Sequence, residues 1–140
     1  MKLIKSIFAG FTVWVLTALL NAVLSSTVIS FFSSEFNRWP STFLLVFIFT
    51  LIFSIPGIFL FWITLLVNWN AEGLFRILLR LGFIVSGLSS LLIYALPMEM
   101  ETGQLLLLSL CMVIATVTSI MLHHSILKSI TAINKNENYV

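Results

Sequence analysis

The sequence predicts an all-α integral membrane protein whose four transmembrane helices form an antiparallel up-down bundle. Of its 140 residues, 60% are hydrophobic and only 9% are charged, whereas a soluble domain carries roughly 25% charged residues. The mean hydropathy is +1.15. The charged residues divide the chain into four uncharged stretches. A helix needs ~20 apolar residues to cross ~30 Å of hydrocarbon, so each stretch is long enough or nearly so for one span. Residues 1–140 are therefore expected to form a single membrane domain.

We place the four spans at residues 6–28, 42–67, 77–96 and 104–127. The third stretch is the shortest, and it reaches spanning length if Arg80 extends its guanidinium toward the lipid headgroups. The later spans lack the polar-apolar alternation that marks the ~10-residue strands of a membrane barrel. In lipid a helix satisfies its own backbone hydrogen bonds, which favours helices even in the β-prone second stretch.

The N-terminal apolar run follows Lys2 and Lys5, as it would in a signal peptide. However, the run from Ile7 to Leu24 exceeds the ~7–15 residues of a signal core, and no suitable small-residue cleavage site follows it. We therefore expect an uncleaved first span.

The positions of Lys and Arg predict the orientation of the chain. One side of the membrane receives only Arg38, and the other receives Lys2, Lys5, Arg76, Arg80, Lys128 and Lys135. Basic residues accumulate on the cytoplasmic side of membrane proteins. Both termini are therefore expected to be cytoplasmic, and the expected location is a bacterial cytoplasmic (inner) membrane.

Small residues recur every four positions in three spans, which predicts faces where helices pack closely. The first span has Ala18, Ala22 and Ser26, the third has Gly82, Ser86 and Ser90, and the fourth has Ala115, Ser119 and His123. Such spacing also arises by chance, because Ala and Ser are common in membrane helices. In the second span, Pro56 and Gly57 predict a kink near Ser54. That kink is either a hinge or ligand notch, or merely a feature of packing.

Two polar groups within or near the spans are candidate sites. Asn21 has Thr17 and Ser25 one turn away on the same face. These three side chains either line a path for a small solute or ion, or form hydrogen bonds between helices. The second group lies at the cytoplasmic end and consists of Arg76, Arg80, His123 and His124. It is either a cationic rim for an anionic lipid or acidic partner, or an ordinary set of topology determinants and interfacial anchors.

Several chemistries are disfavoured by the residues present. All five acidic residues are Glu in loops or the tail, which argues against proton-coupled exporters and against phosphotransferases that hold Mg²⁺ on paired Asp. His123 and His124 point ~100° apart on one helix, so they cannot clasp one haem iron. Cys111 is expected to be a small buried hydrophobe. We expect no catalytic residue, no metal, no cofactor and no nucleic-acid partner.

The expected function is therefore non-enzymatic binding of another membrane component. An accessory subunit, an assembly factor and an immunity-type protein all fit this class. The expected partners are the lipid bilayer and either a membrane protein or further copies of the chain. The alternative is an oligomeric channel or passive transporter for a small solute or ion. A membrane enzyme acting on lipid is the least favoured class.

Overall fold

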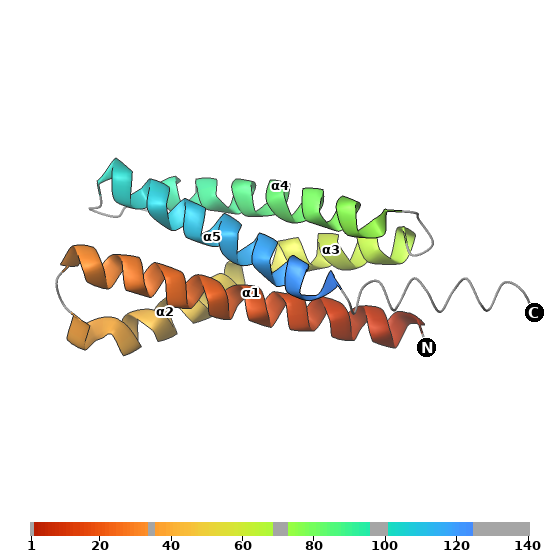
Figure 1. The fold of residues 1–140 in the computed structure, drawn as a ribbon, viewed down its shortest axis with the longest axis horizontal. Helices are drawn as coiled ribbons and strands as arrows, with labels where there is room; N and C mark the ends of the chain where they lie inside the picture. Colours follow the sequence, from red (N-terminus) through yellow and green to blue (C-terminus); the bar gives the residue numbers. More distant parts are fainter. Residues whose placement is uncertain (1, 34–35, 69–72, 96–100, 125–140) are drawn as a thin grey trace, which may run out of the picture.

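The computed structural model describes residues 2–33, 36–68, 73–95 and 101–124, and this part of the chain contains helices and no strand. The elements in chain order are α1 (Lys2–Ser33), a short 3₁₀ helix η1 (Phe36–Arg38), α2 (Trp39–Phe53), α3 (Ile55–Val67), α4 (Leu74–Ala95) and α5 (Thr102–Leu122). The helices lie lengthwise beside one another (Figure 1). The N-terminus lies at one end of the molecule, which we call the terminal end, and the connection from α1 to α2 lies at the other.

Three of these helices are long and apolar enough to cross a membrane by themselves, namely α1, α4 and α5. The bent pair α2 and α3 supplies a fourth span if the two helices are counted as one. The all-helical architecture with three to four apolar helices fits a multi-pass integral membrane protein.

The predicted span 42–67 is not one continuous helix, because α2 and α3 meet at Ser54 with a bend of 50°. At the end of α2, the Ser54 N–H donates to the Thr50 carbonyl at 3.0 Å. At the start of α3, the Ile58 N–H donates to the Ser54 carbonyl at 3.0 Å. Pro56 has no N–H to continue the ladder between them. The Ser54 hydroxyl also donates to the Thr50 carbonyl. The break thus lies at the position where the sequence predicts a kink.

The other helices differ from the predicted spans mainly at their ends. α1 extends beyond 6–28 in both directions, and α4 begins three residues before the predicted 77. A helix continues past the hydrocarbon until a backbone signal ends it. Before α4 that signal is Gly73, whose φ of +89° favours glycine. The last part of the predicted fourth span, residues 125–127, lies outside the described residues.

An apolar core occupies the terminal half of the molecule. It joins all the spans there, through Ala9, Val13, Phe61, Leu65, Leu74, Leu78 and Ile120. Leu65 and Leu78 are completely buried. Shortening such a side chain to Ala costs roughly 2–5 kcal/mol in a well-packed core.

Small residues replace this apolar core along the rest of the α1, α4 and α5 interfaces. The eight predicted packing residues are all buried: Ala18, Ala22, Ser26, Gly82, Ser86, Ser90, Ala115 and Ser119. A Cβ added at Gly82 would overlap Cδ1 of Ile120. A side chain at position 82 would therefore require Ile120 to move.

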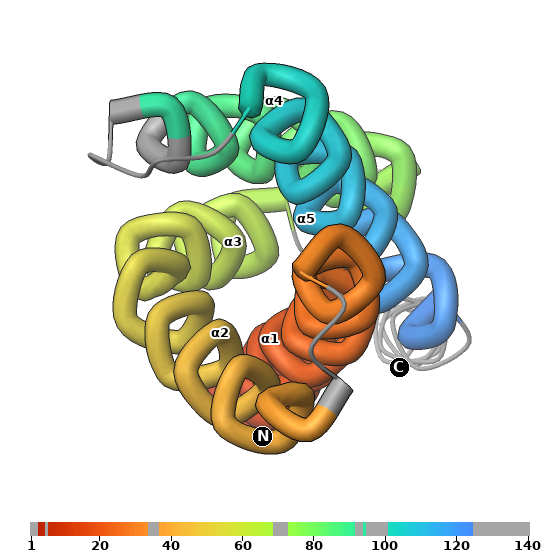
Figure 2. Tube along the Cα trace, turned by 90° about the vertical axis from the view of Figure 1, so that its left-hand side faces the viewer, coloured from red at the N-terminus to blue at the C-terminus, as the bar shows by residue number. Residues whose placement is uncertain are grey.

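The neighbours of α2 differ from those of the other helices. α1 packs chiefly against α5 and α2, and α4 packs chiefly against α5. α3 lies between α1 and α4, whereas α2 packs mainly on α1 (Figure 2). Thr50 is the one buried side chain of α2. The bend thus directs α2 away from α4 and α5.

Candidate functional site

The contact between α1 and α2 is held by buried polar groups. The Asn21 Nδ2 donates to the Thr50 Oγ1 at 2.9 Å, and the Ser25 hydroxyl donates to the Asn21 Oδ1 at 3.1 Å. Thr50 itself donates to the Val46 carbonyl at 2.7 Å. All three side chains of this network are buried. Asn21 therefore joins α1 to α2, Ser25 bonds to Asn21 from the same helix, and Thr17 is not part of this network.

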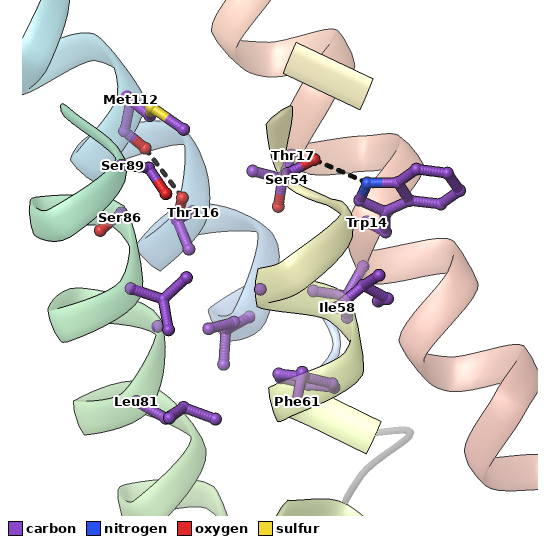
Figure 3. A pocket seen from close by; sticks show the side chains of 15 residues that line it. Trp14, Thr17, Ser54, Ile58, Phe61, Leu81, Ser86, Ser89, Met112 and Thr116 are labelled. Atoms are coloured by element: carbon purple, nitrogen blue, oxygen red, sulfur yellow. Dashed lines mark hydrogen bonds between the residues drawn. The ribbon is translucent and has the colours of Figure 1, made fainter. Parts of the chain in front are cut away.

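The junction of α2 and α3 is tied to α1 by a second contact. The Trp14 Nε1 donates to the Ser54 Oγ at 2.7 Å (Figure 3). Ser54 can accept this bond because its own hydrogen is directed to a carbonyl of α2. The bend is therefore fixed at the residue where the backbone ladder is interrupted.

A third polar contact joins the first helix to the last. The Ser119 hydroxyl of α5 donates to the Val13 carbonyl of α1 at 2.9 Å, and both side chains are buried. A backbone carbonyl that accepts a bond from another helix is less available to a side chain of its own helix. This contact therefore affects Thr17, which lies one turn after Val13.

A cavity of about 70 Å³ lies between these contacts, beside the bend. Its lining comes from α1, α3, α4, α5 and the residue at the junction of α2 and α3. Between its polar groups the walls are aliphatic, with Val13, Ile58, Val85 and Ile120 among them. On one side the cavity passes Gly57, where an added Cβ would meet Cγ1 of Val85 at 2.8 Å. Of the two predicted kink residues, Gly57 thus lines the cavity, and Pro56 is exposed.

Five hydroxyl side chains line the cavity, and we call them the hydroxyl cluster: Thr17, Ser54, Ser86, Ser89 and Thr116 (Figure 3). Three of them donate to carbonyls of their own chain segment. Ser54 donates to Thr50, Ser86 to Phe83 at 3.1 Å, and Thr116 to Met112 at 2.9 Å. Because their hydrogens are used in this way, these three hydroxyls can act toward a ligand only as acceptors, and the Ser54 oxygen already receives the Trp14 N–H.

Thr17 and Ser89 differ from the other three, because neither hydroxyl has a hydrogen-bond partner within the described chain. Thr17 is only 8% exposed. A helical Thr ordinarily donates to the carbonyl four residues before it, but for Thr17 that carbonyl, Val13, accepts Ser119. A buried hydroxyl left without a partner costs roughly 1–3 kcal/mol. The cavity therefore contains two polar groups that are still available.

The structure places the four residues of the predicted cationic rim in different surroundings. His123 is buried, and its Nδ1 lies 2.9 Å from the Ser119 carbonyl, which can only accept a hydrogen from it. Exposed His124 packs on Phe75, with ring centroids 4.2 Å apart. Arg76 and Arg80 are exposed on α4. Arg76, Arg80 and His124 are thus candidates for a surface site, whereas His123 belongs to the helix interface.

A metal site is not formed by the described residues, since no three His, Cys, Asp or Glu side chains come together there. Cys111 is buried and is not in a disulfide.

Sequence reasoning did not identify Trp14, Thr50, Ser89 or Thr116 as parts of a site. One signal was available, because each predicted span carries a Ser or Thr within one residue of its midpoint. Thr116 could have been found in this way. Trp14 and Thr50 could not, because their roles depend on how α2 is placed against α1.

The comparisons with known proteins supply no relative. No protein-family model, no curated protein and no solved structure matches this chain.

Proposed function

We propose that this chain is a non-enzymatic membrane protein that acts by binding another membrane component. An accessory subunit, an assembly factor and an immunity-type protein belong to this class. The observation that carries the proposal is the placement of α2, which the 50° bend directs away from α4 and α5. Apart from its contacts with α1 and its chain neighbours, α2 is therefore left uncovered by the other described helices.

The side chains exposed on α2 are large and apolar. On α2 the exposed ones are Leu44, Leu45, Ile48, Phe49, Ile52 and Phe53. Phe49 and Phe53 are stacked, with ring centroids 5.7 Å apart. On α4, Leu88 and Leu91 are each 61% exposed. Exposed apolar side chains face lipid in any membrane protein, so the feature that favours a helix as the partner is that α2 lacks the neighbours that cover the other helices. A transmembrane helix of a partner can pack against such an uncovered face.

The proposed arrangement in the membrane has four spans, with α2 and α3 together forming the second. The spans form an antiparallel up-down bundle, and both termini are cytoplasmic in a bacterial cytoplasmic membrane. The six-to-one distribution of Lys and Arg supports this orientation. The placement of the α1 to α2 connection at the end opposite the N-terminus supports the alternation of the spans (Figure 1).

The second candidate is an oligomeric channel or passive transporter for a small solute or ion. The hydroxyl cluster favours it, because this cluster places polar groups inside the membrane. A cavity of about 70 Å³ is too small to be an open pore through one copy, so a path through the membrane would need several copies.

Two measurements test the proposal. The full chain is purified in mild detergent, and the mass of the complex and the identity of any stoichiometric partner are determined by mass spectrometry. The variant Phe49→Ala with Ile52→Ala changes the exposed side of α2, and Leu106→Ala with Ile114→Ala is the matched control on the exposed side of α5. Loss of one partner from the α2 variant alone is the expected result. Equal retention by both variants, together with solute flux in liposomes that contain only this chain, would favour the transporter.

A further inference from the structure

The five side chains of the hydroxyl cluster lie near the middles of the predicted spans. Thr17, Ser54, Ser86 and Thr116 each lie within one residue of the midpoint of a different predicted span. Ser89 lies one turn beyond Ser86 on α4. All five line one cavity, so each predicted span contributes a hydroxyl residue to the same place near its middle (Figure 3). Hydrocarbon cannot satisfy polar groups at this depth.

We propose that this cavity binds a small uncharged molecule that both donates and accepts hydrogen bonds, water being the smallest member of that class. The inference is independent of the membrane partner proposed above, because the cavity lies among the helices of a single chain. Its evidence is the set of polar groups, their hydrogen bonds and the size of the space.

Two hydroxyls of the cluster have no hydrogen-bond partner in the described chain, and a ligand that forms hydrogen bonds would supply one. Thr17 is buried, faces the cavity and has no partner within the described chain, because the Val13 carbonyl is taken by Ser119. Ser89 is also without a partner in the described part. Thr17 and Ser89 can each donate one hydrogen bond to a ligand. Ser86 and Thr116 can each accept one, since their own hydrogens bond to carbonyls.

The charge and size of the ligand follow from the lining. No ionisable side chain lines the cavity, and a charge placed in hydrocarbon without a partner is strongly disfavoured. The volume of about 70 Å³ is room for a few water molecules, because one water needs roughly 10–15 Å³ of space measured in this way. Aliphatic walls that hold a few placed polar groups are typical of small-molecule sites. A lipid tail would fill the same volume but would leave Thr17 and Ser89 unpaired.

The first experiment asks whether water occupies the cavity. The full chain, with ¹³C-labelled Thr and Ser, is placed in lipid bilayers, and magnetisation transfer from water to each side chain is measured by solid-state NMR. Transfer to Thr17 and Ser89 is expected to be at least threefold faster than transfer to Ser26. Ser26 is a matched control, because it is completely buried on α1 and donates to the Ala22 carbonyl.

The second experiment asks whether a larger member of the class also binds. Acetamide is titrated against the fluorescence of Trp14, which lines the cavity, in the variant Trp39→Phe, Trp62→Phe and Trp69→Phe. Acetate has nearly the same shape but is charged, and serves as the control solute. A saturable response to acetamide and none to acetate is expected if the site accepts solutes. Thr17→Val removes one hydroxyl at nearly constant volume and is expected to abolish that response.

The outcomes separate clearly. Water transfer to Thr17 and Ser89, with or without an acetamide response, supports the proposal, and the acetamide response decides between water and a solute. The proposal is overturned if neither is seen. A higher melting temperature of Thr17→Val than of wild type would then agree with a dry cavity in which the Thr17 hydroxyl is only a cost. The melting temperature also shows whether the variant is folded.

Discussion

Asn21 and Thr50 form the buried side-chain contact between α1 and α2, with the Asn21 Nδ2 2.9 Å from the Thr50 Oγ1. Thr50 is also the one buried residue of α2. The attachment of α2 to the bundle therefore includes a polar pair at the one buried residue of α2.

The first prediction is that Asn21 and Thr50 are energetically coupled. Asn21→Leu and Thr50→Val should each destabilise the protein, and the double variant should lose less than the two effects together. Hydrogen bonds between membrane helices give coupling energies of about 0.6 kcal/mol on average, with a maximum of ~1.7 kcal/mol. Unfolding in mixed micelles measures all three variants. Strictly additive losses would show that the pair contributes nothing as a pair.

The second prediction concerns two glycines of α4. Gly82→Leu should destabilise the protein by about 1–3 kcal/mol, because an added side chain meets Ile120. Gly87→Leu should be tolerated, since nothing lies within 4 Å of a Cβ at that position. Ala22→Leu, at a completely buried position of α1, should behave like Gly82→Leu. Thermal unfolding in detergent compares the three variants, and equal melting temperatures would contradict the assigned interfaces.

The third prediction concerns anionic lipid. A lipid that binds only the folded protein raises its stability by RT ln(1 + [L]/Kd). The double variant Arg76→Gln with Arg80→Gln should lose most of the melting-temperature increase that anionic lipid gives the wild type. His123→Gln should lower stability equally with and without lipid, because His123 is buried against the Ser119 carbonyl. If the lipid effect survives without both Arg residues, Arg76 and Arg80 are topology signals alone.

The fourth prediction concerns topology. A reporter that is active only outside the cytoplasm should be active when fused after Glu101 and inactive when fused after Val140. The physical reason is the excess of Lys and Arg on the side of the termini. The reverse pattern, active after Val140 and inactive after Glu101, would contradict the arrangement in which both termini are cytoplasmic and α2 with α3 forms one span.

The helical membrane architecture follows from the sequence, because hydrocarbon imposes simple constraints on length and charge. Pro56 likewise indicated where the second span departs from a continuous helix. The direction and size of the bend did not follow, since they depend on contacts such as that of Trp14 with Ser54. These contacts depend on how two helices are placed relative to each other. A pattern that predicts a helix does not predict that placement.

The candidate site likewise contains residues that the sequence identifies and contacts that it does not predict. Asn21 was identified from its polarity alone. Nothing in the sequence distinguishes its partner Thr50 from the other Ser and Thr residues of the spans. His123 and His124 are adjacent in the sequence, yet one is buried and the other exposed, because one residue of helix turns a side chain by ~100°. Only the Ser119 contact with Val13 explains why Thr17 has a free hydroxyl.

That contact also has a consequence for how the chain is made. Ser119 and Val13 are 106 positions apart, and α5 is a chief neighbour of α1. Because synthesis delivers α1 first and α5 last, the face of α1 that contacts α5 enters the membrane before its partner exists. A chain that stops before α5 leaves this face uncovered in the bilayer. This exposed face gives a membrane-bound protease or chaperone a physical feature by which to distinguish an unfinished chain from a complete one.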